Sequence, residues 1–108
     1  GNLEARRDFT DVRDVVRAYR LLIEKGTLGE VYHIASSRAY SISYVLDTLL
    51  AMSSSAIQVK QDASRMRPSD TPVLVGAIDK LTAATAWKPE IPIETSLKDI
   101  LEYWRKRV

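Results

Sequence analysis

The chain has 108 residues, of which 45% are hydrophobic and 28% are charged, and these fractions are typical of a globular domain rather than a disordered segment. A formal net charge of +2, with acidic and basic residues interleaved, does not provide the concentrated basic face that nucleic-acid binding requires. There is no cysteine, which excludes disulfides and zinc–thiolate sites, and no apolar run approaches the roughly 20 residues that span a bilayer. We therefore expect one cytoplasmic domain or a part of one, with no nucleic acid and no membrane among its partners.

Apolar spacing predicts a first helix over residues 10–25. Thr10 is the expected N-cap, and Gly26 suits the left-handed position that follows a last helical turn. The apolar side chains recur at steps of three and four and form one stripe, which consists of Val12, Val15, Val16, Tyr19, Leu22 and Ile23.

The rest of the chain predicts two strands and three helices. Residues 31–35 form a β-branched and aromatic run typical of a buried strand, and residues 57–60 alternate like a half-buried strand. Ser41 should cap a second helix that ends in the serine run 53–55. Residues 62–72 are expected to be irregular, and helices are expected over residues 78–85 and 93–105 with a proline-rich connector between them.

This pattern predicts an α/β fold that is incomplete. A two-stranded sheet is marginal without covering partners. Helices on either side of one strongly hydrophobic strand are typical of the end of a larger parallel sheet. We therefore expect the chain to be a part of a larger fold.

No set of residues for catalysis is recognisable. Glycine occurs only at positions 1, 26, 29 and 76, so neither a dinucleotide-binding loop nor a P-loop can be formed. No tyrosine is followed four residues later by lysine, and the single histidine, His33, cannot build a metal site. We interpret His33 as hydrogen-bonded within the sheet or facing a cleft. The acidic pairs at 11/14 and 99/102 are interpreted as solvated partners of Arg and Lys.

Two arginines and one aspartate suggest a ligand. Arg7 and Arg67 lie in segments that read as turns, and Asp70 follows Arg67 across a proline that stiffens the loop. A guanidinium matches a phosphate bidentately, and a carboxylate can accept from both hydroxyls of a ribose. The alternative is that Arg7 forms a surface ion pair with Asp8 or Asp11 and that the Arg67 loop is merely solvated.

The sequence resembles the C-terminal half of the extended short-chain dehydrogenase/reductases that act on GDP-sugars, in the branch of GDP-mannose 4,6-dehydratase and GDP-4-keto-6-deoxy-mannose reductase. The segments that carry this resemblance are residues 1–19, which include Arg-Arg-Asp-Phe-Thr-Asp-Val-Arg-Asp-Val, residues 29–36 with Gly-Glu-Val-Tyr-His-Ile-Ala-Ser, residues 67–70 with Arg-Pro-Ser-Asp, and residues 87–92 with Trp-Lys-Pro-Glu-Ile-Pro. The Arg-Asp-Phe-Thr-Asp run looks more like the reductases than the dehydratases.

The resemblance implies the C-terminal part of a modified Rossmann fold, in which residues 31–35 are the last sheet strand and the remainder is a small sugar-nucleotide-binding domain. It implies that Arg7 and Arg67 hold the diphosphate, that Asp70 binds the ribose and that Asn2 lies near the nucleotide sugar. His33 would lie where the strand approaches the cofactor, as a weak contact. Family members often have Asn at position 33, Gly at 37 and Asp at 77, where this chain has His, Ser and Ala.

The expected function is therefore the GDP-sugar-binding portion of an NAD(P)-dependent enzyme. NAD(P) binding and the catalytic tyrosine and lysine belong to an N-terminal half that these 108 residues do not contain, so we expect the chain alone to bind no cofactor and not to catalyse. It should associate with that half or with itself. The alternatives are a self-contained interaction module, or one subunit of a split enzyme. The sequence does not fix the base, the sugar or the direction of the redox step.

Overall fold

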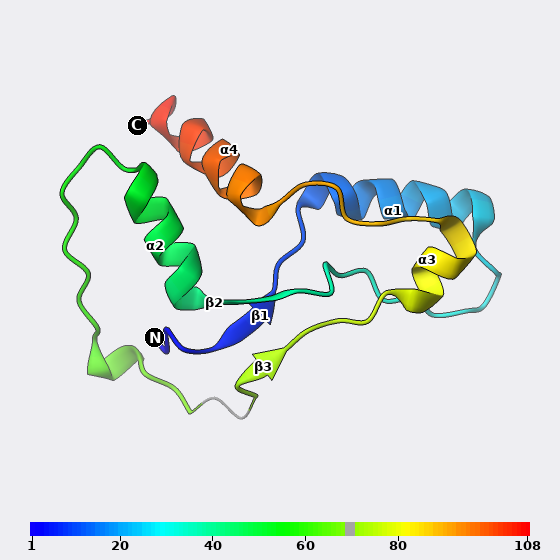
Figure 1. Ribbon diagram of the computed structural model, residues 1–108, viewed down its shortest axis with the longest axis horizontal. Helices are drawn as coiled ribbons and strands as arrows, with labels where there is room; N and C mark the ends of the chain where they lie inside the picture. Colours follow the sequence, from blue (N-terminus) through cyan, green and yellow to red (C-terminus); the bar gives the residue numbers. More distant parts are fainter. Residues whose placement is uncertain (69–70) are drawn as a thin grey trace.

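The computed structural model describes residues 1–68 and 71–108, in which helices alternate with short strands (Figure 1). In chain order the elements are β1 (Arg6–Asp8), α1 (Val12–Lys25), β2 (Ala39–Ser41), α2 (Ile42–Met52), the 3₁₀ turn η1 (Ala63–Arg65), β3 (Val73–Leu74), α3 (Asp79–Thr85) and α4 (Ile93–Arg105). The predicted α/β class is confirmed.

The sheet has the order β2-β1-β3, with β1 in the centre. β1 runs antiparallel to β2, with Arg7 opposite Tyr40, and parallel to β3, with Arg7 opposite Leu74. None of these strands was predicted from the sequence. Each is only two or three residues long, which is too short for an alternating pattern to be recognised.

The two predicted strands are wrong for this structure. Residues 31–35 and 57–60 belong to no β-ladder in the described part of the chain. Val31, Ile57 and Val59 are all exposed there. A strand exists only where a neighbour accepts and donates its backbone hydrogen bonds, and the described residues offer these two segments none.

Helix α1 lies where it was predicted, but it begins two residues later and its caps differ from the predicted ones. Its N-cap is Asp11 rather than Thr10, and the Asp11 carboxylate accepts from the backbone N–H of Arg13 at 2.9 Å. Gly26 has φ −71°, so it is not left-handed as predicted. Glycine is needed there for space, because a Cβ at position 26 would lie 2.5 Å from the carbonyl oxygen of Leu22.

The helices form two pairs, at opposite ends of the molecule. α2 packs against α4 and α1 packs against α3, with the sheet between the pairs (Figure 1). Ser41 caps α2 as predicted, since its hydroxyl accepts from the N–H of Tyr44 at 3.0 Å. α3 ends at Ala86, whose φ of 62° lies in the left-handed region.

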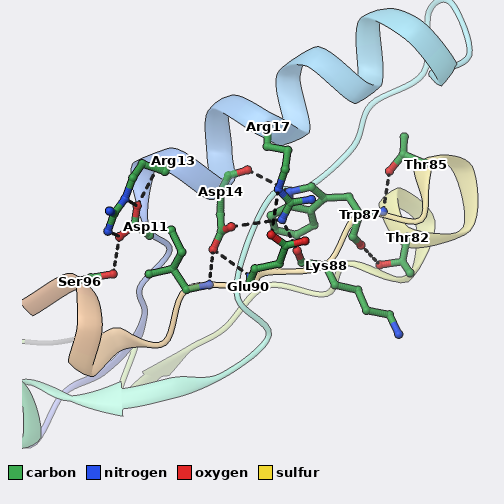
Figure 2. A network of polar contacts seen from close by, with 11 residues as sticks. Asp11, Arg13, Asp14, Arg17, Thr82, Thr85, Trp87, Lys88, Glu90 and Ser96 are labelled. Atoms are coloured by element: carbon green, nitrogen blue, oxygen red, sulfur yellow. Dashed lines mark hydrogen bonds and ion pairs between the residues drawn. The ribbon is translucent and has the colours of Figure 1, made fainter.

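A polar network joins α1 to the connector between α3 and α4 (Figure 2). Asp14, which is only 2% exposed, accepts from the backbone N–H groups of Glu90 at 3.1 Å and Ile91 at 3.0 Å. Its other oxygen accepts from Arg17 at 3.2 Å, and the Arg17 guanidinium lies 5.6 Å from the centre of the Trp87 ring. The interpretation of Asp14 as a solvated charge is therefore wrong, because this carboxylate is a buried part of the fold.

The core is small for the length of the chain. Its centre consists of Ala18, Leu81 and Trp87, all fully buried. The radius of gyration is 16.8 Å, whereas a compact domain of this length has roughly 13 Å. Much of the α1 stripe lies outside the core, with Val12 70%, Val16 59% and Ile23 87% exposed. The described residues therefore leave a long apolar helix face without cover.

Candidate functional site

Three of the four predicted ligand-binding residues line a single open pocket. Asn2, Arg7 and Arg67 all contribute to this pocket, whose volume is about 490 Å³. Asn2 and Arg7 come from the beginning of the chain and Arg67 from a loop sixty residues later. The fold therefore brings side chains that are distant in the sequence to one pocket. The remaining lining residues, which sequence reasoning missed, are Ala5, Ile42, Pro68 and Thr71.

Arg7 is held by the central strand of the sheet. Its backbone lies in β1 between β2 and β3, and its Nη1 donates to the carbonyl oxygen of Arg6 at 2.7 Å. The two carboxylates that the sequence offered as ion-pair partners are engaged elsewhere. Asp11 binds Arg13 at 2.8 Å, and Asp8 accepts from backbone amides.

Hydrogen bonds hold the chain in place before and after Arg67. Upstream, Gln61 Nε2 donates to the carbonyl oxygen of Gly1 at 3.2 Å, and downstream the N–H of Arg6 donates to the carbonyl oxygen of Pro72 at 2.9 Å. Arg65, two residues before Arg67, forms an ion pair with Asp62 at 3.8 Å. Within the described residues the guanidinium of Arg67 makes no hydrogen bond or ion pair, and its side chain is exposed.

The pocket also touches the first residue of α2, but the amides at that helix end are already used. The N–H of Ile42 donates to Ala5 O at 3.0 Å, that of Ser43 to Leu3 O at 2.9 Å and that of Tyr44 to Ser41 Oγ at 3.0 Å. A helix N-terminus binds an anion through free N–H groups. An anion in this pocket would therefore be bound mainly by the two guanidiniums.

Asn2 offers a donor to the same space. Its Oδ1 accepts from the N–H of Glu4 at 2.9 Å, which fixes the orientation of the amide. Because the oxygen is engaged by the protein, the NH₂ group is the part of this side chain suited to an oxygen of a ligand.

The carboxylate of Asp8 connects the site to two other segments. Oδ1 accepts from the N–H of Ser36 at 2.7 Å, and Oδ2 accepts from those of Ser37 at 3.0 Å and Gly76 at 3.1 Å. Burial alone would raise the pKa of Asp8, but the hydrogen bonds from these amides outweigh it and lower the pKa below the ordinary 3.8. Asp8 is thus ionised at neutral pH and holds its neighbours as an anion.

The other two predicted residues are Asp70 and His33. Asp70 lies outside the described residues. His33 lies in the extended segment before Ser36, is exposed, and is not among the residues that line the pocket. Its suggested contact with a cofactor stays a prediction.

A second, apolar groove of about 580 Å³ lies between the start of α1 and the α2–α4 pair. It is lined mainly by Phe9, Val12, Val45, Leu97, Ile100 and Tyr103. Among the described residues no three His, Cys, Asp or Glu side chains are grouped to hold a metal ion, and no helix there is both long and apolar enough to cross a membrane.

Comparison with known proteins identifies the relatives of this arrangement. Residues 1–100 match the family described as GDP-mannose 4,6 dehydratase. The chain is 36% identical to GDP-6-deoxy-D-mannose reductase of Pseudomonas aeruginosa over 108 residues, which are 100% of this chain and 36% of that protein. It is 31% identical to GDP-6-deoxy-D-talose 4-dehydrogenase of Aggregatibacter actinomycetemcomitans over 81 residues, which are 75% of this chain and 28% of that one.

Solved structures give the same result. The structure of RMD from Pseudomonas aeruginosa complexed with NADPH superposes with a TM-score of 0.93 at 36% identity, covering 100% of this chain and 35% of that one. A putative epimerase from Burkholderia cenocepacia superposes with a TM-score of 0.91 at 38% identity, covering 98% and 35% of the two chains. The chain thus spans about a third of the length of these relatives.

Proposed function

The chain belongs to the GDP-mannose 4,6-dehydratase family, and we propose that it is the nucleotide-sugar-binding portion of an NAD(P)-dependent enzyme of that family. Its fold is that of the corresponding third of Rossmann-fold short-chain dehydrogenase/reductases. The observation that carries the proposal is the meeting of Arg7 and Arg67 at one pocket.

The pocket suits a nucleoside diphosphate. Two guanidiniums supply two positive charges and forked donors, which match the oxygens of adjacent phosphates. Asn2 adds a neutral donor for a hydroxyl or a carbonyl. The role of ribose ligand for Asp70 rests on the resemblance, and we propose it on that ground.

A reductase acting on a GDP-linked sugar is the favoured activity of the complete enzyme. The relative with 36% identity over the whole chain is a GDP-6-deoxy-D-mannose reductase, and a second relative acts on a GDP-6-deoxy-talose. The Arg-Asp-Phe-Thr-Asp run in β1 and the start of α1 also favours a reductase over a dehydratase.

NAD(P) does not fit the residues of this chain. Its four glycines, at positions 1, 26, 29 and 76, form no glycine-rich turn, and one of them, Gly26, has its N–H bonded to the carbonyl oxygen of Leu22 at 2.8 Å. A dinucleotide site needs a glycine-rich turn that brings free amides to the pyrophosphate at a helix N-terminus. We infer that the cofactor and the catalytic proton donor are held by a further portion of the enzyme, and that the 108 residues alone do not oxidise NADPH.

The exposed apolar face of α1 supports a cofactor-binding portion that lies outside these 108 residues. Val12, Val16, Tyr19 and Ile23 recur along one side of α1 and are exposed. Relatives that contain the whole of this fold are about three times as long. We infer that the cofactor-binding portion of a complete enzyme packs on this face and supplies strand partners for residues 31–35.

Calorimetric titration of GDP-mannose tests the proposal. We expect the unsubstituted chain to bind and Arg67→Ala to bind about tenfold more weakly or worse, because a hydrogen bond to a charged group contributes roughly 1.5–3 kcal/mol. The matched control is Arg65→Ala, two residues away and paired with Asp62, which should bind within about twofold of the unsubstituted chain. Equal affinities for all three proteins would contradict the phosphate role of Arg67, and no binding by any of them would favour an interaction module without a nucleotide.

A further inference from the structure

Asp8 lies next to Arg7 in the central strand, but its side chain lies on the opposite face of the sheet. Neighbouring residues of a strand project to opposite sides. Arg7 lines the ligand pocket, whereas Asp8 accepts three backbone amides from two other segments. The ligand face and the face with these amide contacts therefore share one short strand.

The first of these segments leads into β2. Ser37 has φ 60°, in the left-handed region, and this conformation turns the consecutive N–H groups of Ser36 and Ser37 toward one anion. The anion is the Asp8 carboxylate, at 2.7 and 3.0 Å. Two residues later the chain enters β2, where Ala39 is the partner of Asp8.

The second segment leaves β3. Gly76 donates its N–H to Asp8 Oδ2 at 3.1 Å, and its carbonyl oxygen accepts from the Ser37 hydroxyl at 2.8 Å. Its neighbourhood leaves no space for a side chain, because a Cβ at position 76 would lie 2.5 Å from the Cβ of Ala35. The segment before β2 and the segment after β3 are thus bound to the same carboxylate.

Arg67 and Thr71 line the pocket together with Arg7, and both precede β3 in the chain. Only two residue pairs, Arg6 with Val73 and Arg7 with Leu74, join β1 to β3. A ladder this short specifies register weakly. The hydrogen bond from Gly76 to Asp8 lies two residues beyond the ladder and opposes a slip of β3.

We propose that Asp8 is the positioning residue of the phosphate site, and that its hold on the amides of Ser36, Ser37 and Gly76 sets the spacing of Arg7 and Arg67. This inference rests on the proposed function of the two arginines. Asp8 touches no ligand in this scheme and acts through Arg7 and the β3 register.

Asp8→Asn is the variant of choice because it keeps the shape of the side chain but replaces one acceptor oxygen with a donor NH₂ group. An amide NH₂ group would face at least one backbone N–H, so a donor would oppose a donor. The matched control is Asp14→Asn, which changes the other carboxylate that accepts two backbone amides but lies outside the pocket.

The affinity for GDP is measured for the unsubstituted chain, Asp8→Asn, Arg7→Ala, the double variant and Asp14→Asn. We expect Asp8→Asn and Arg7→Ala each to lose about tenfold, and the double variant to be within about threefold of Arg7→Ala, since two residues acting through one contact are not additive. Asp14→Asn should stay within about twofold. A double variant whose loss is the product of the two single losses would overturn the positioning role.

A measurement without substitution covers the case in which Asp8→Asn does not fold. Linkage is reciprocal, so if these contacts favour GDP binding by a given factor, GDP stabilises them by the same factor. Saturating GDP should slow amide hydrogen exchange at Gly76 by about tenfold and leave the Glu90 amide, bound to Asp14, unchanged. Unchanged exchange at Gly76 in a chain that binds GDP refutes the inference alone, whereas a chain that does not bind GDP refutes the proposed function as well.

Discussion

The indole Nε1 of Trp87 donates a hydrogen bond to the backbone carbonyl of Asp14 at 3.0 Å, across 73 residues of sequence. Trp87 is fully buried, and the side chain of the same Asp14 accepts from the amides of Glu90 and Ile91 (Figure 2). One residue of α1 thus fixes both the ring at the centre of the core and the connector that leads to α4.

Asp14→Ala should therefore be among the most destabilising single changes in this chain. It leaves two partly buried backbone N–H groups without an acceptor and removes the ion pair between Asp14 and Arg17, which costs about 2–4 kcal/mol of the free energy of unfolding. Urea denaturation measures this. Asp47→Ala, at an exposed position of α2, is the control and should cost less than about 0.5 kcal/mol. A similar small cost for both variants would show that this network does not stabilise the fold.

Ala86→Gly should stabilise the protein. Ala86 has φ 62° at the end of α3, where an L-residue is strained by roughly 1–2 kcal/mol. Glycine removes that strain, but its greater freedom in the unfolded chain costs roughly 0.4–1 kcal/mol of stability. The free energy of unfolding should therefore rise by about 0.5–1 kcal/mol, with a small rise in Tm. Ala83→Gly, at an exposed position inside α3, should instead cost about 1 kcal/mol. A lower Tm for Ala86→Gly would contradict the left-handed assignment.

Acid should unfold the protein through Asp8 and Asp11. Burial opposes ionisation of Asp8, but hydrogen bonds from Ser36, Gly76 and Ser37 lower its pKa below 3.8, and the Arg13 guanidinium holds the pKa of Asp11 well below its usual range. A lowered pKa in the folded state contributes stability above the unfolded-state pKa and loses it as the pH falls through the folded-state pKa.

The free energy of unfolding should therefore be nearly constant from pH 7 to 5 as far as these two groups are concerned, and should fall below about pH 4. Urea titrations at several pH values check this, and Asp8→Asn should show a shallower fall because one of the titrating groups is gone. The same slope in the variant and the unsubstituted protein would contradict the lowered pKa of Asp8.

The exposed face of α1 should make the isolated chain self-associate. Burying a few hundred Å² of apolar surface contributes several kcal/mol at roughly 25 cal/mol per Å², before the entropy of association is subtracted. Light scattering across a hundredfold concentration range should show a mass that rises above 12.2 kDa. Ile23→Asp should reduce this rise, and Ala51→Asp, at an exposed position of α2, should not. A monodisperse particle of 12.2 kDa at all concentrations would favour a self-contained module.

The sequence predicted where the helices lie because each has enough turns for its apolar spacing to be recognised, although both predicted caps of α1 were wrong. α4 has the predicted bounds, and Ser41 caps α2 as expected. The strands were not predictable in the same way. Residues 31–35 have the composition of a buried strand, but strand pairing depends on neighbours that the described residues do not supply.

The residues alone suggested Arg7 and Arg67 as phosphate ligands but left the surface alternative open, and only the resemblance favoured the ligand. Spacing alone could not decide whether Arg7 pairs with Asp8 or binds a ligand, because that depends on which segments cross β1. The structure engages Asp8 with amides at positions 36, 37 and 76, and those partners carry no side-chain signal in the sequence. The burial of Asp14 was missed for the same reason, since its partners are backbone N–H groups 76 and 77 residues away.

If Arg7 and Arg67 together hold a diphosphate, the arginine Nε–H resonances observed by NMR during a titration with GDP report it. We expect the Arg7 and Arg67 signals to shift with GDP and not with guanosine, because only GDP brings phosphates. The signals of Arg65 and Arg105, which pair with Asp62 and Glu102, should stay in place. Shifts confined to other arginines, or equal shifts with guanosine and GDP, would show that Arg7 and Arg67 do not hold the diphosphate.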